Sequence, residues 1–519
     1  MKSTIPLLLI ISISINLFSQ VKDLGQIEFP NSGSEDAQES FIRGVLLLHS
    51  FEYEDAADEF RIAQKTDKDF ALAYWGEAMT YNHPIWLQQN KDKAIRVLER
   101  LGKTSGERLA KAKSEKEKMW LMSLEVLYGN GTKEDNDYEY EDFMKLFSEK
   151  YPDDLEIASF YSLSILGTCH DGRDIPTYHR AAAVAEKVYQ INTNHPGALH
   201  YIIHSYDDPE NAPKALDAAH NYAKVAPSAS HALHMPTHIF VALGMWEDVV
   251  RENIRSAQAA DERRARKNLG LDARGYHAIW WLEYGYLQLG KVSKAREILN
   301  QMHKEALESG SPRTRMHFSV MKAAYLVETD NWSDDVLKMK VDLAGMNNSI
   351  KVLNGFLEGY GAIKNNNMEK AKSILVDLKQ MNTGIATFAE YNLDEKESAV
   401  MVSLLEGSYL YESGKTSEGI NLLNKARESE ESLSYSFGPP AIPKPSHEIL
   451  GEIYLKEGNF NLAESNFRTS LQRAPRRVMS LKGLYKALKE LTMMEQAEEI
   501  LADIKKIREN ADRDLYPEK

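Results

Sequence analysis

The chain has 519 residues, a formal net charge of −14, and a composition in which 43% of residues are hydrophobic and 27% are charged. This length is too great for one ordinary hydrophobic core, so we expect several domains or an array built by repetition. The negative balance argues against nucleic acid as a partner, because contacts to phosphates require a basic surface.

Residues 1–20 are typical of a secretory signal peptide. Lys2 supplies the positive end, an apolar stretch interrupted by serines runs from Ile5 to Phe18, and Ser19-Gln20 suggest a nearby cleavage site. The apolar stretch is too short for a membrane span, and no segment of the mature chain approaches one. The only cysteine is Cys169, so the leader offers no lipidation site and the mature chain no internal disulfide. We therefore predict a periplasmic or secreted protein of a Gram-negative bacterium.

Small and large apolar residues recur along the chain at the spacing of paired helices. Near the N-terminus the pattern is Ala56, Phe60 and Ala63, and near the C-terminus it comprises Gly451, Tyr454, Gly458, Ala463, Phe467 and Pro475. Two antiparallel helices approach closely only where a small residue leaves room. In this frame the first helices of the pairs lie near residues 40, 74, 124, 158, 199, 233, 279, 319, 355, 403, 447 and 481. Irregular insertions are expected at 169–175, about 257–275 and 437–445.

The C-terminal pattern resembles the tetratricopeptide repeat (TPR), and the resemblance extends over most of the mature chain. The strings HPGALHYIIHSYDDP (195–209) and APSASHALHMPTHIFVALGMW (226–246) are further similar to a group of bacterial TPR proteins without an established activity. The resemblance implies an all-α, right-handed superhelix of about a dozen helical hairpins. We divide the chain into a signal peptide (1–20), N-terminal TPR-like repeats with insertions (21–190), central repeats (191–300), degenerate repeats (301–400) and C-terminal repeats (401–519).

Two HxxxH pairs are the most informative functional feature of the sequence. His200 and His204 form the first pair, and His234 and His238 repeat it 34 residues later, which is the length of one TPR unit. Residues four apart lie on the same face of a helix, so two neighbouring repeats would bring four imidazoles together. Pro236 lies between the two histidines of the second pair. The helix that carries this pair is therefore either kinked at Pro236 or begins late.

The TPR resemblance also implies which side chains face the concave groove. Ligands of TPR proteins generally contact fixed positions of the first helices. On this sequence those positions carry the two HxxxH pairs together with Asp207, Asp208, His231, His277, Trp280 and Tyr284.

Clustered neutral imidazoles are suited to binding a transition metal. Three or four histidines with a carboxylate favour Zn, Cu, Ni or Fe over Ca or Mg. Asp207 and Asp208 would be ligands or would orient a ring. Trp280 and Tyr284 would form an aromatic wall for an organic ligand. The four predicted metal ligands are His200, His204, His234 and His238.

Other interpretations of the histidines stay open. The groove could recognise an acidic peptide without metal, or the paired histidines could be duplicated structural residues. His195 is expected to cap a helix, His83 to pack, and His447 to be buried and hydrogen-bonded. The segment Cys169-His170-Asp171 could lend a ligand to the cluster.

The sequence favours an exported binding or scaffold protein whose groove takes a protein or peptide partner, or a small ligand, with a bound transition metal. A metal-dependent enzyme, such as a hydrolase centred on the same histidines, is one alternative, and a metal-free scaffold is another. No catalytic residue can be assigned from the sequence.

Overall fold

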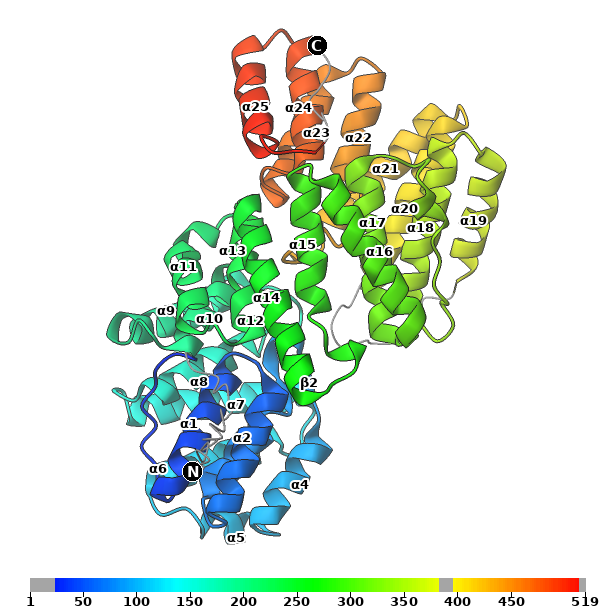
Figure 1. Ribbon diagram of the computed structural model, residues 1–519. Helices are drawn as coiled ribbons and strands as arrows, with labels where there is room; N and C mark the ends of the chain where they lie inside the picture. Colours follow the sequence, from blue (N-terminus) through cyan, green and yellow to red (C-terminus); the bar gives the residue numbers. More distant parts are fainter. Residues whose placement is uncertain (1–23, 382–394, 513–519) are drawn as a thin grey trace, which may run out of the picture.

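The computed structural model describes residues 24–381 and 395–512, and most of them lie in helices (Figure 1). The predicted signal peptide falls outside the described residues. Within them, no helix is both long enough and apolar enough to cross a membrane.

Antiparallel helix pairs follow one another along the chain. The N-terminal helices are α1 (Glu35–His49), α2 (Tyr53–Thr66), α3 (Ala71–Met79), α4 (Lys91–Leu101), α5 (Ser105–Leu109), α6 (Glu115–Leu127) and α7 (Lys133–Lys150). The central helices are α8 (Leu155–Leu166), α9 (Ile175–Ile191), α10 (Pro196–Tyr206), α11 (Leu216–Val225), α12 (Ser230–His234), α13 (Pro236–Ala242), α14 (Trp246–Lys267), α15 (Tyr276–Gln288) and α16 (Val292–Ser309). The C-terminal helices are α17 (Pro312–Thr329), α18 (Asn348–Lys364), α19 (Met368–Gln380), α20 (Glu395–Glu412), α21 (Thr416–Glu431), α22 (Ser446–Lys456), α23 (Phe460–Arg473), α24 (Val478–Glu490) and α25 (Met494–Ile507).

Short elements fill some of the connections. The 3₁₀ turns are η1 (Pro84–Trp86), η2 (Ala212–Ala215), η3 (Leu271–Ala273) and η4 (Asp335–Lys338). The strands β1 (Asn82–His83) and β2 (Gln88–Gln89) pair antiparallel around η1, with Asn82 opposite Gln89.

The predicted fold class is confirmed: the chain is an all-α, TPR-type solenoid of helical hairpins. A helix lies at every predicted first-helix position from residue 40 to residue 481. The three predicted insertions are also present, between α8 and α9, between α14 and α15, and between α21 and α22. After α17 the second helix of the pair is replaced by η4 and irregular chain.

Glycine on the first helices makes room for a phenylalanine on the second. A Cβ added at Gly451 or Gly483 would lie 2.7 or 2.2 Å from the ring of Phe467. Phe60 is held in the same way near the N-terminus, where a Cβ at Gly44 or Gly76 would lie 2.7 or 2.3 Å from its ring. Each ring therefore packs between its own first helix and the next one, which is the physical reason for the repeat pattern in the sequence.

The N-terminal hairpin returns to the centre of the solenoid. The backbone carbonyl of His49, at the end of α1, accepts a hydrogen bond from the His200 ring on α10. Ion pairs join α2 to the long helix α14, where Arg263 contacts Asp55 at 2.7 Å and Lys267 contacts the same carboxylate. The superhelix is therefore tightly curved over its first half.

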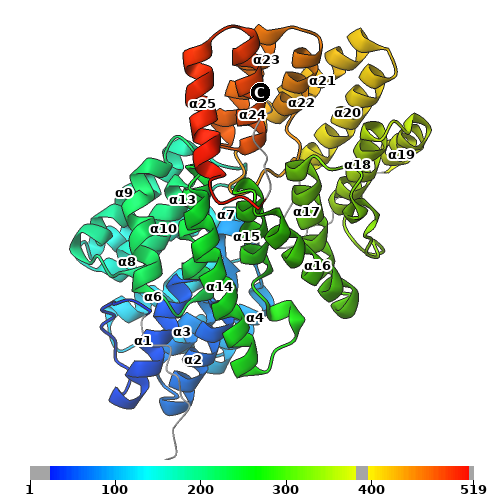
Figure 2. The same cartoon turned by 45° about the horizontal axis from the view of Figure 1, so that its top comes forward.

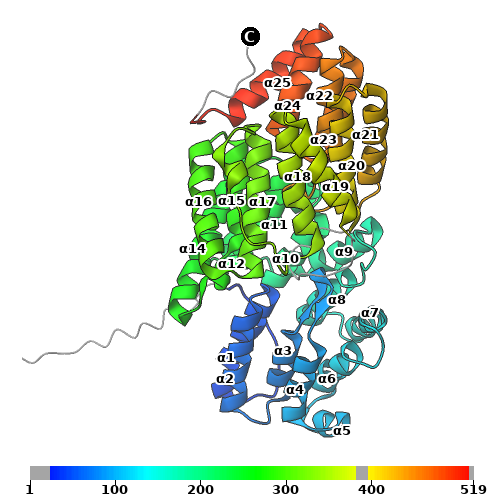
Figure 3. The same cartoon turned by 90° about the vertical axis from the view of Figure 1, so that its right-hand side faces the viewer.

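The C-terminal hairpins pack against the central helices, with α25 beside α13 and α15 in Figure 2, and lie at the opposite end of the molecule from α1 to α6 (Figure 3). Trp246 Nε1 donates to the Arg476 carbonyl at 3.1 Å, and the Arg477 guanidinium donates to the Tyr284 hydroxyl at 3.1 Å. Asp512 accepts hydrogen bonds from the backbone N–H groups of Val292 and Ser293. Helices α10 to α15 are therefore contacted by both ends of the chain, and the insertion between α21 and α22 reaches the same region, where Phe437 contacts His238.

Candidate metal centre

The histidines predicted to face the groove lie together in one buried cluster. His200 and His204 come from α10, His231 and His234 from α12, and His238 from α13. His277 joins them from α15. The exposed fractions of His200, His204, His234 and His238 are only 0–3%. The structure therefore brings the two predicted pairs together, and other parts of the chain cover the rings.

The six rings form two neighbouring groups of three. In the first, the centroid of His200 lies 4.8 Å from that of His204 and 5.1 Å from that of His231. In the second, His234 lies 5.2 Å from His238 and 4.4 Å from His277. Within each group, one ring nitrogen per residue lies within 4.8 Å of the others. The groups adjoin, because the His204 and His238 centroids are 5.5 Å apart.

Pro236 divides the second HxxxH pair between two helices. Helix α12 ends at His234 and α13 begins at Pro236, while Met235 between them keeps helical torsion angles. Proline has no N–H to donate, so the hydrogen-bond ladder is interrupted at this point. Of the two expected outcomes, the structure shows a break within a nearly continuous helical run, and His234 lies at that break.

Acceptors from outside the cluster hold the Nδ1 atoms of three rings. His200 Nδ1 donates to the His49 carbonyl at 2.6 Å, His234 Nδ1 to Asn253 Oδ1 at 2.7 Å, and His238 Nδ1 to Asp207 Oδ2 at 3.1 Å. An acceptor at Nδ1 places the ring proton there and leaves a lone pair at Nε2. These contacts therefore select the tautomer that binds a metal through Nε2.

The opposite nitrogens of the cluster lack hydrogen-bond partners. Within the described residues, the Nε2 atoms of His200, His204, His231 and His234 are buried and make no hydrogen bond. A buried polar atom left without a partner costs about 1–3 kcal/mol. Four such atoms lie together here, and a bound water or ion is the kind of partner that satisfies buried polar atoms of this sort.

Burial and the neighbouring imidazoles lower the pKa values of His200, His231, His234 and His277. The pKa of His200 lies well below its usual value because of burial, with further lowering by His204 and His231. Burial also lowers the pKa values of His231, His234 and His277 in the same direction. Neutral imidazole is the form that binds metal, so the rings are ready as ligands at neutral pH.

Asp207 links the two groups of rings. Its Oδ2 accepts the hydrogen bond from His238 and lies 3.7 Å from His204 Nδ1, while its Oδ1 accepts from Arg173 at 2.5 Å. Burial alone would raise the pKa of Asp207, but Arg173, His204 and His238 outweigh this effect and lower it. Asp207 is therefore a charged acceptor that orients rings, which is one of the two roles expected for it.

Asp208 lies outside the cluster. Its carboxylate accepts from Arg173 at 3.0 Å and from the backbone N–H groups of Glu210 and Asn211, so it stabilises the turn after α10. The expectation that Asp208 faces a ligand is therefore corrected. Asp207 and Asp208 both lie beyond Tyr206, the last residue of α10, so the helical register does not decide which of them faces the rings.

The aromatic wall predicted at Trp280 is formed by its neighbour. The Trp281 ring lies 4.7 Å from His238, 4.8 Å from His234 and 5.2 Å from His277. The Trp280 centroid lies 6.2 Å from that of His277. Adjacent residues of a helix point in different directions, so Trp281 packs on the histidine rings while Trp280 lines a neighbouring cavity.

Phe51 and Phe437 cover the cluster from distant segments. The Phe51 centroid lies 4.2 Å from that of His200, and the Phe437 centroid lies 4.8 Å from that of His238. Phe51, Arg173 and Asn253 were not predicted as site residues. Arg173 and Phe437 do lie in two of the irregular insertions expected from the sequence, at 169–175 and 437–445.

Trp280 and Tyr284 line a cavity on the far side of Phe437. This cavity is partly open to solvent. Its wall includes Arg477, whose charge is countered by Glu448 at 2.7 Å and Glu328 at 2.7 Å. The two predicted groove aromatics are therefore in a cavity next to the histidines, as an organic ligand beside the cluster would require.

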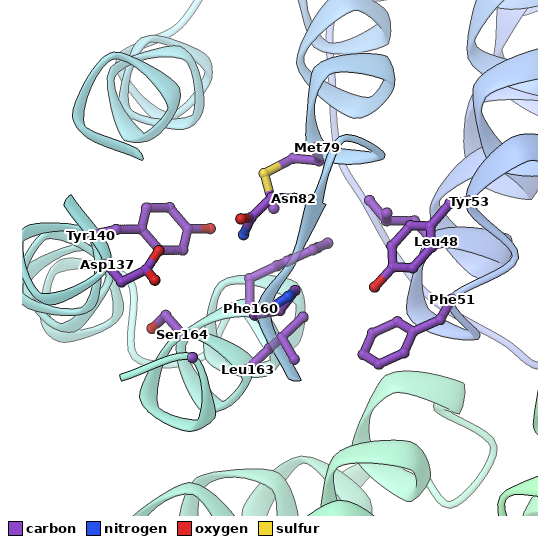
Figure 4. Close-up of a pocket in the computed structure, with 12 residues that line it drawn as sticks. Leu48, Phe51, Tyr53, Met79, Asn82, Asp137, Tyr140, Phe160, Leu163 and Ser164 are labelled. Carbon is purple, nitrogen blue, oxygen red and sulfur yellow. The ribbon is translucent and has the colours of Figure 1, made fainter. Parts of the chain in front are cut away.

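A second cavity lies behind Phe51. Tyr53 and Tyr140 stand on opposite sides of it with Asn82 between them (Figure 4). Within the described residues, the Tyr53 and Tyr140 hydroxyls are buried and make no hydrogen bond. Phe51 separates this cavity from the rings of His200 and His204.

The other candidate histidines have structural roles. His195 caps α10 by accepting from the Ala198 N–H, and His447 is buried between Asn466 and Glu431, as predicted. His83 stacks on the Tyr53 ring at 4.0 Å. His170 lies 3.0 Å from Asp137 and lends nothing to the cluster.

His49, Glu156 and His195 form another group of potential metal ligands, but their side chains are already hydrogen-bonded. Glu156 accepts from His49 at 2.8 Å and from His195 at 3.0 Å, and the remaining nitrogen of His49 contacts the Tyr201 hydroxyl. Every donor of this trio is already in a hydrogen bond, so its proximity alone does not indicate a metal.

No family model and no curated protein matches this sequence. Among solved structures, human IFIT1 with m7Gppp-AAAA is 13% identical over 93% of this chain and 91% of that chain, with a TM-score of 0.35. Yeast Tom70 is 12% identical over 90% and 96% of the two chains, with a TM-score of 0.34. Cut9 of the APC/C Cut9–Hcn1 hetero-tetramer is 13% identical over 89% and 78%, with a TM-score of 0.36. Similarity at this level carries no functional argument, and the fold is assigned on the helices themselves.

Proposed function

We propose that this solenoid is a binding protein whose histidine cluster holds a transition metal. One observation carries the proposal: the Nδ1 atoms of His200, His234 and His238 are held by acceptors, while four Nε2 atoms of the cluster are buried without a partner. A bound ion would supply the missing interaction at each of those nitrogens. We further propose that residues 1–20 are a signal peptide that directs export of the protein.

The donor set restricts the metal. All six candidate ligands are imidazoles, and the nearest carboxylate, Asp207, is engaged by Arg173 and His238. Calcium and magnesium prefer shells of oxygen, so the site suits Zn, Cu, Ni or Fe.

The cavity lined by Trp280 and Tyr284 is the proposed place for a small organic ligand. Its wall is mainly aromatic, proline and alanine side chains, and Phe437 separates it from His238. Mostly apolar cavities with a few polar groups are typical ligand sites. A protein or peptide partner would contact outer surfaces, because the histidine rings themselves are covered.

A metal-dependent enzyme is the second candidate, and the same cavity favours it. A substrate held there would need only the Phe437 side chain to move before it reached the metal. Turnover that depends on the metal and is lost in Phe437→Trp would support this candidate over a pure binding protein.

Elemental analysis of the purified full chain tests the proposed function. We expect a transition metal in the natural protein and markedly less in His204→Ala and in His238→Ala. His447→Ala is the matched control, because it removes a buried histidine that is already paired on both nitrogens. Equal, negligible metal in all four proteins would contradict the proposal.

A further inference from the structure

The six clustered histidines divide into two complete sets of three donors. His200, His204 and His231 form one set, and His234, His238 and His277 form the other. Three nitrogens bound to one ion at ~2.1 Å lie about 3.4 Å apart, so small side-chain rotations would close each set, whose donors lie within 4.8 Å. A further group of possible ligands, His204, Asp207 and His238, takes one ring from each set. A single ion would therefore use either one set or this bridging group, and in each case unpaired nitrogens would remain elsewhere in the cluster.

Unpaired nitrogens are present in both sets. Among the described residues, the Nε2 atoms of His200, His204 and His231 belong to the first set, and that of His234 to the second. Each set also has its own hydrogen-bond acceptor from outside the cluster. The His49 carbonyl accepts from a ring of the first set, and Asn253 accepts from a ring of the second. Asp207 lies between the sets, in contact with His204 and His238. This is the arrangement of two separately oriented but adjacent sites.

The surroundings favour ions of low charge. Aromatic rings of Phe51, Trp281 and Phe437 pack on the histidines. The Asp207 carboxylate, which contacts the rings, is countered by Arg173 at 2.5 Å. Glu52 accepts a hydrogen bond from the backbone N–H of His231. Burying charge in an apolar environment is costly, and the cost rises steeply with the charge of the ion. Two divalent ions would bring four positive charges into this cage, whereas two monovalent ions would bring two.

We propose that the histidine cluster is a dinuclear copper centre, in which each set of three imidazoles holds one copper(I) ion. Copper(I) is the monovalent ion among the metals that imidazole suits, and three neutral nitrogens satisfy it without a charged ligand. This inference rests on the proposed function, because it specifies the number and identity of the ions at the same site.

Anaerobic loading of the full-length, metal-stripped chain with copper(I) tests the inference. After unbound metal is removed, elemental analysis should give two copper ions per chain, and parallel loading with zinc should give no more than one zinc ion. The double variant His200→Ala/His231→Ala should retain one copper, and so should His234→Ala/His277→Ala. His195→Ala should retain two, because that histidine belongs to the separate trio with Glu156.

X-ray absorption of the copper-loaded natural protein gives an independent measurement that needs no variant. It should show about three nitrogen neighbours per copper and a second copper nearby. One copper per chain, or the loss of both ions in either double variant, would overturn the dinuclear centre. Two zinc ions with fewer coppers would overturn the assignment to copper. Binding of neither metal would instead contradict the proposed function itself.

Discussion

Two repeats of this solenoid carry the same buried histidine–asparagine pair. His234 Nδ1 contacts Asn253 Oδ1 at 2.7 Å, and His447 Nδ1 contacts Asn466 Oδ1 at 2.9 Å, with 19 residues between the partners in each case. Each asparagine also donates to the carbonyl four residues earlier on its own helix. The asparagine therefore fixes the orientation of a first-helix histidine in both repeats, whatever the function of that histidine.

The two pairs differ at the other ring nitrogen. His447 Nε2 contacts Glu431 at 2.9 Å, whereas His234 Nε2 is buried without a hydrogen bond. The His234 ring has imidazole neighbours at His238 and His277, while His447 belongs to no group of three potential ligands among the described residues. Orientation is thus shared between repeats, and what distinguishes the candidate site is an unpaired nitrogen together with converging neighbours.

His49, His195 and Glu156 form a trio in which both carboxylate oxygens and the ring nitrogens already have hydrogen-bond partners. Its contribution to the free energy of unfolding is the largest effect that we expect. Burial alone would raise the pKa of Glu156, but His195 and His49 outweigh it and lower the pKa to about 2. The stabilisation is therefore complete above the ordinary value of 4.5 and is lost as the pH falls through about 2. We expect it to be worth about 3 kcal/mol.

Urea unfolding of the metal-free protein from pH 6 down to pH 2 checks this prediction against Glu156→Gln. The gap in unfolding free energy between the two proteins should shrink as the pH falls below 4.5. Copper or other metal content at pH 7 should be the same in both, because the trio is complete without an ion. A loss of metal in Glu156→Gln would mean that the trio also takes part in metal binding and is not separate from the six-histidine cluster.

Asp207 is the one acceptor that touches both sets of rings, so its removal should have the next largest effect. We expect Asp207→Asn to weaken metal binding by roughly 10–100-fold, the usual cost of losing a residue that orients a ligand. Competition with a chromophoric chelator measures the affinity. Asp208→Asn is the control, because Asp208 contacts Arg173 and a turn but none of the rings. Equal weakening in both variants would show that Arg173, and not the rings, is the relevant partner.

The sequence predicted the helices well and the site in part. The interval between the HxxxH pairs was enough to place His200, His204, His234 and His238 together, because it reflects packing between adjacent repeats. Phe51 and Phe437 could not be predicted, since they reach the cluster only through the curvature of the whole superhelix. The domain boundaries drawn from the sequence stay predictions.

Asn253 and Asn466 offer a matched test with a smaller effect. Asn253→Ala should weaken metal binding by about tenfold, because only one of the six rings loses its acceptor. Asn466→Ala should leave metal binding unchanged. Each variant should lower the free energy of unfolding of the metal-free protein by about 1–2 kcal/mol through the lost hydrogen bonds. Urea denaturation and chelator competition on both variants give the two values, and an equal affinity loss would mean that the effect is one of general stability.

Removal of the Glu431 carboxylate should have the smallest effect on stability and on metal content. It tests whether an unpaired ring nitrogen is enough for a metal site or whether converging imidazoles are needed as well. In Glu431→Ala, His447 Nε2 loses its protein partner while Asn466 still holds Nδ1, so the ring is oriented as in His234 and has no protein group at Nε2. The Glu431 side chain is 44% exposed, so water can replace it and the unfolding free energy should fall by less than about 1 kcal/mol. No metal should be gained over the natural protein in elemental analysis, because one oriented imidazole without converging neighbours makes a weak ligand. An additional bound ion would show that a free nitrogen is sufficient, and the convergence of rings at 200–277 would then lose its significance.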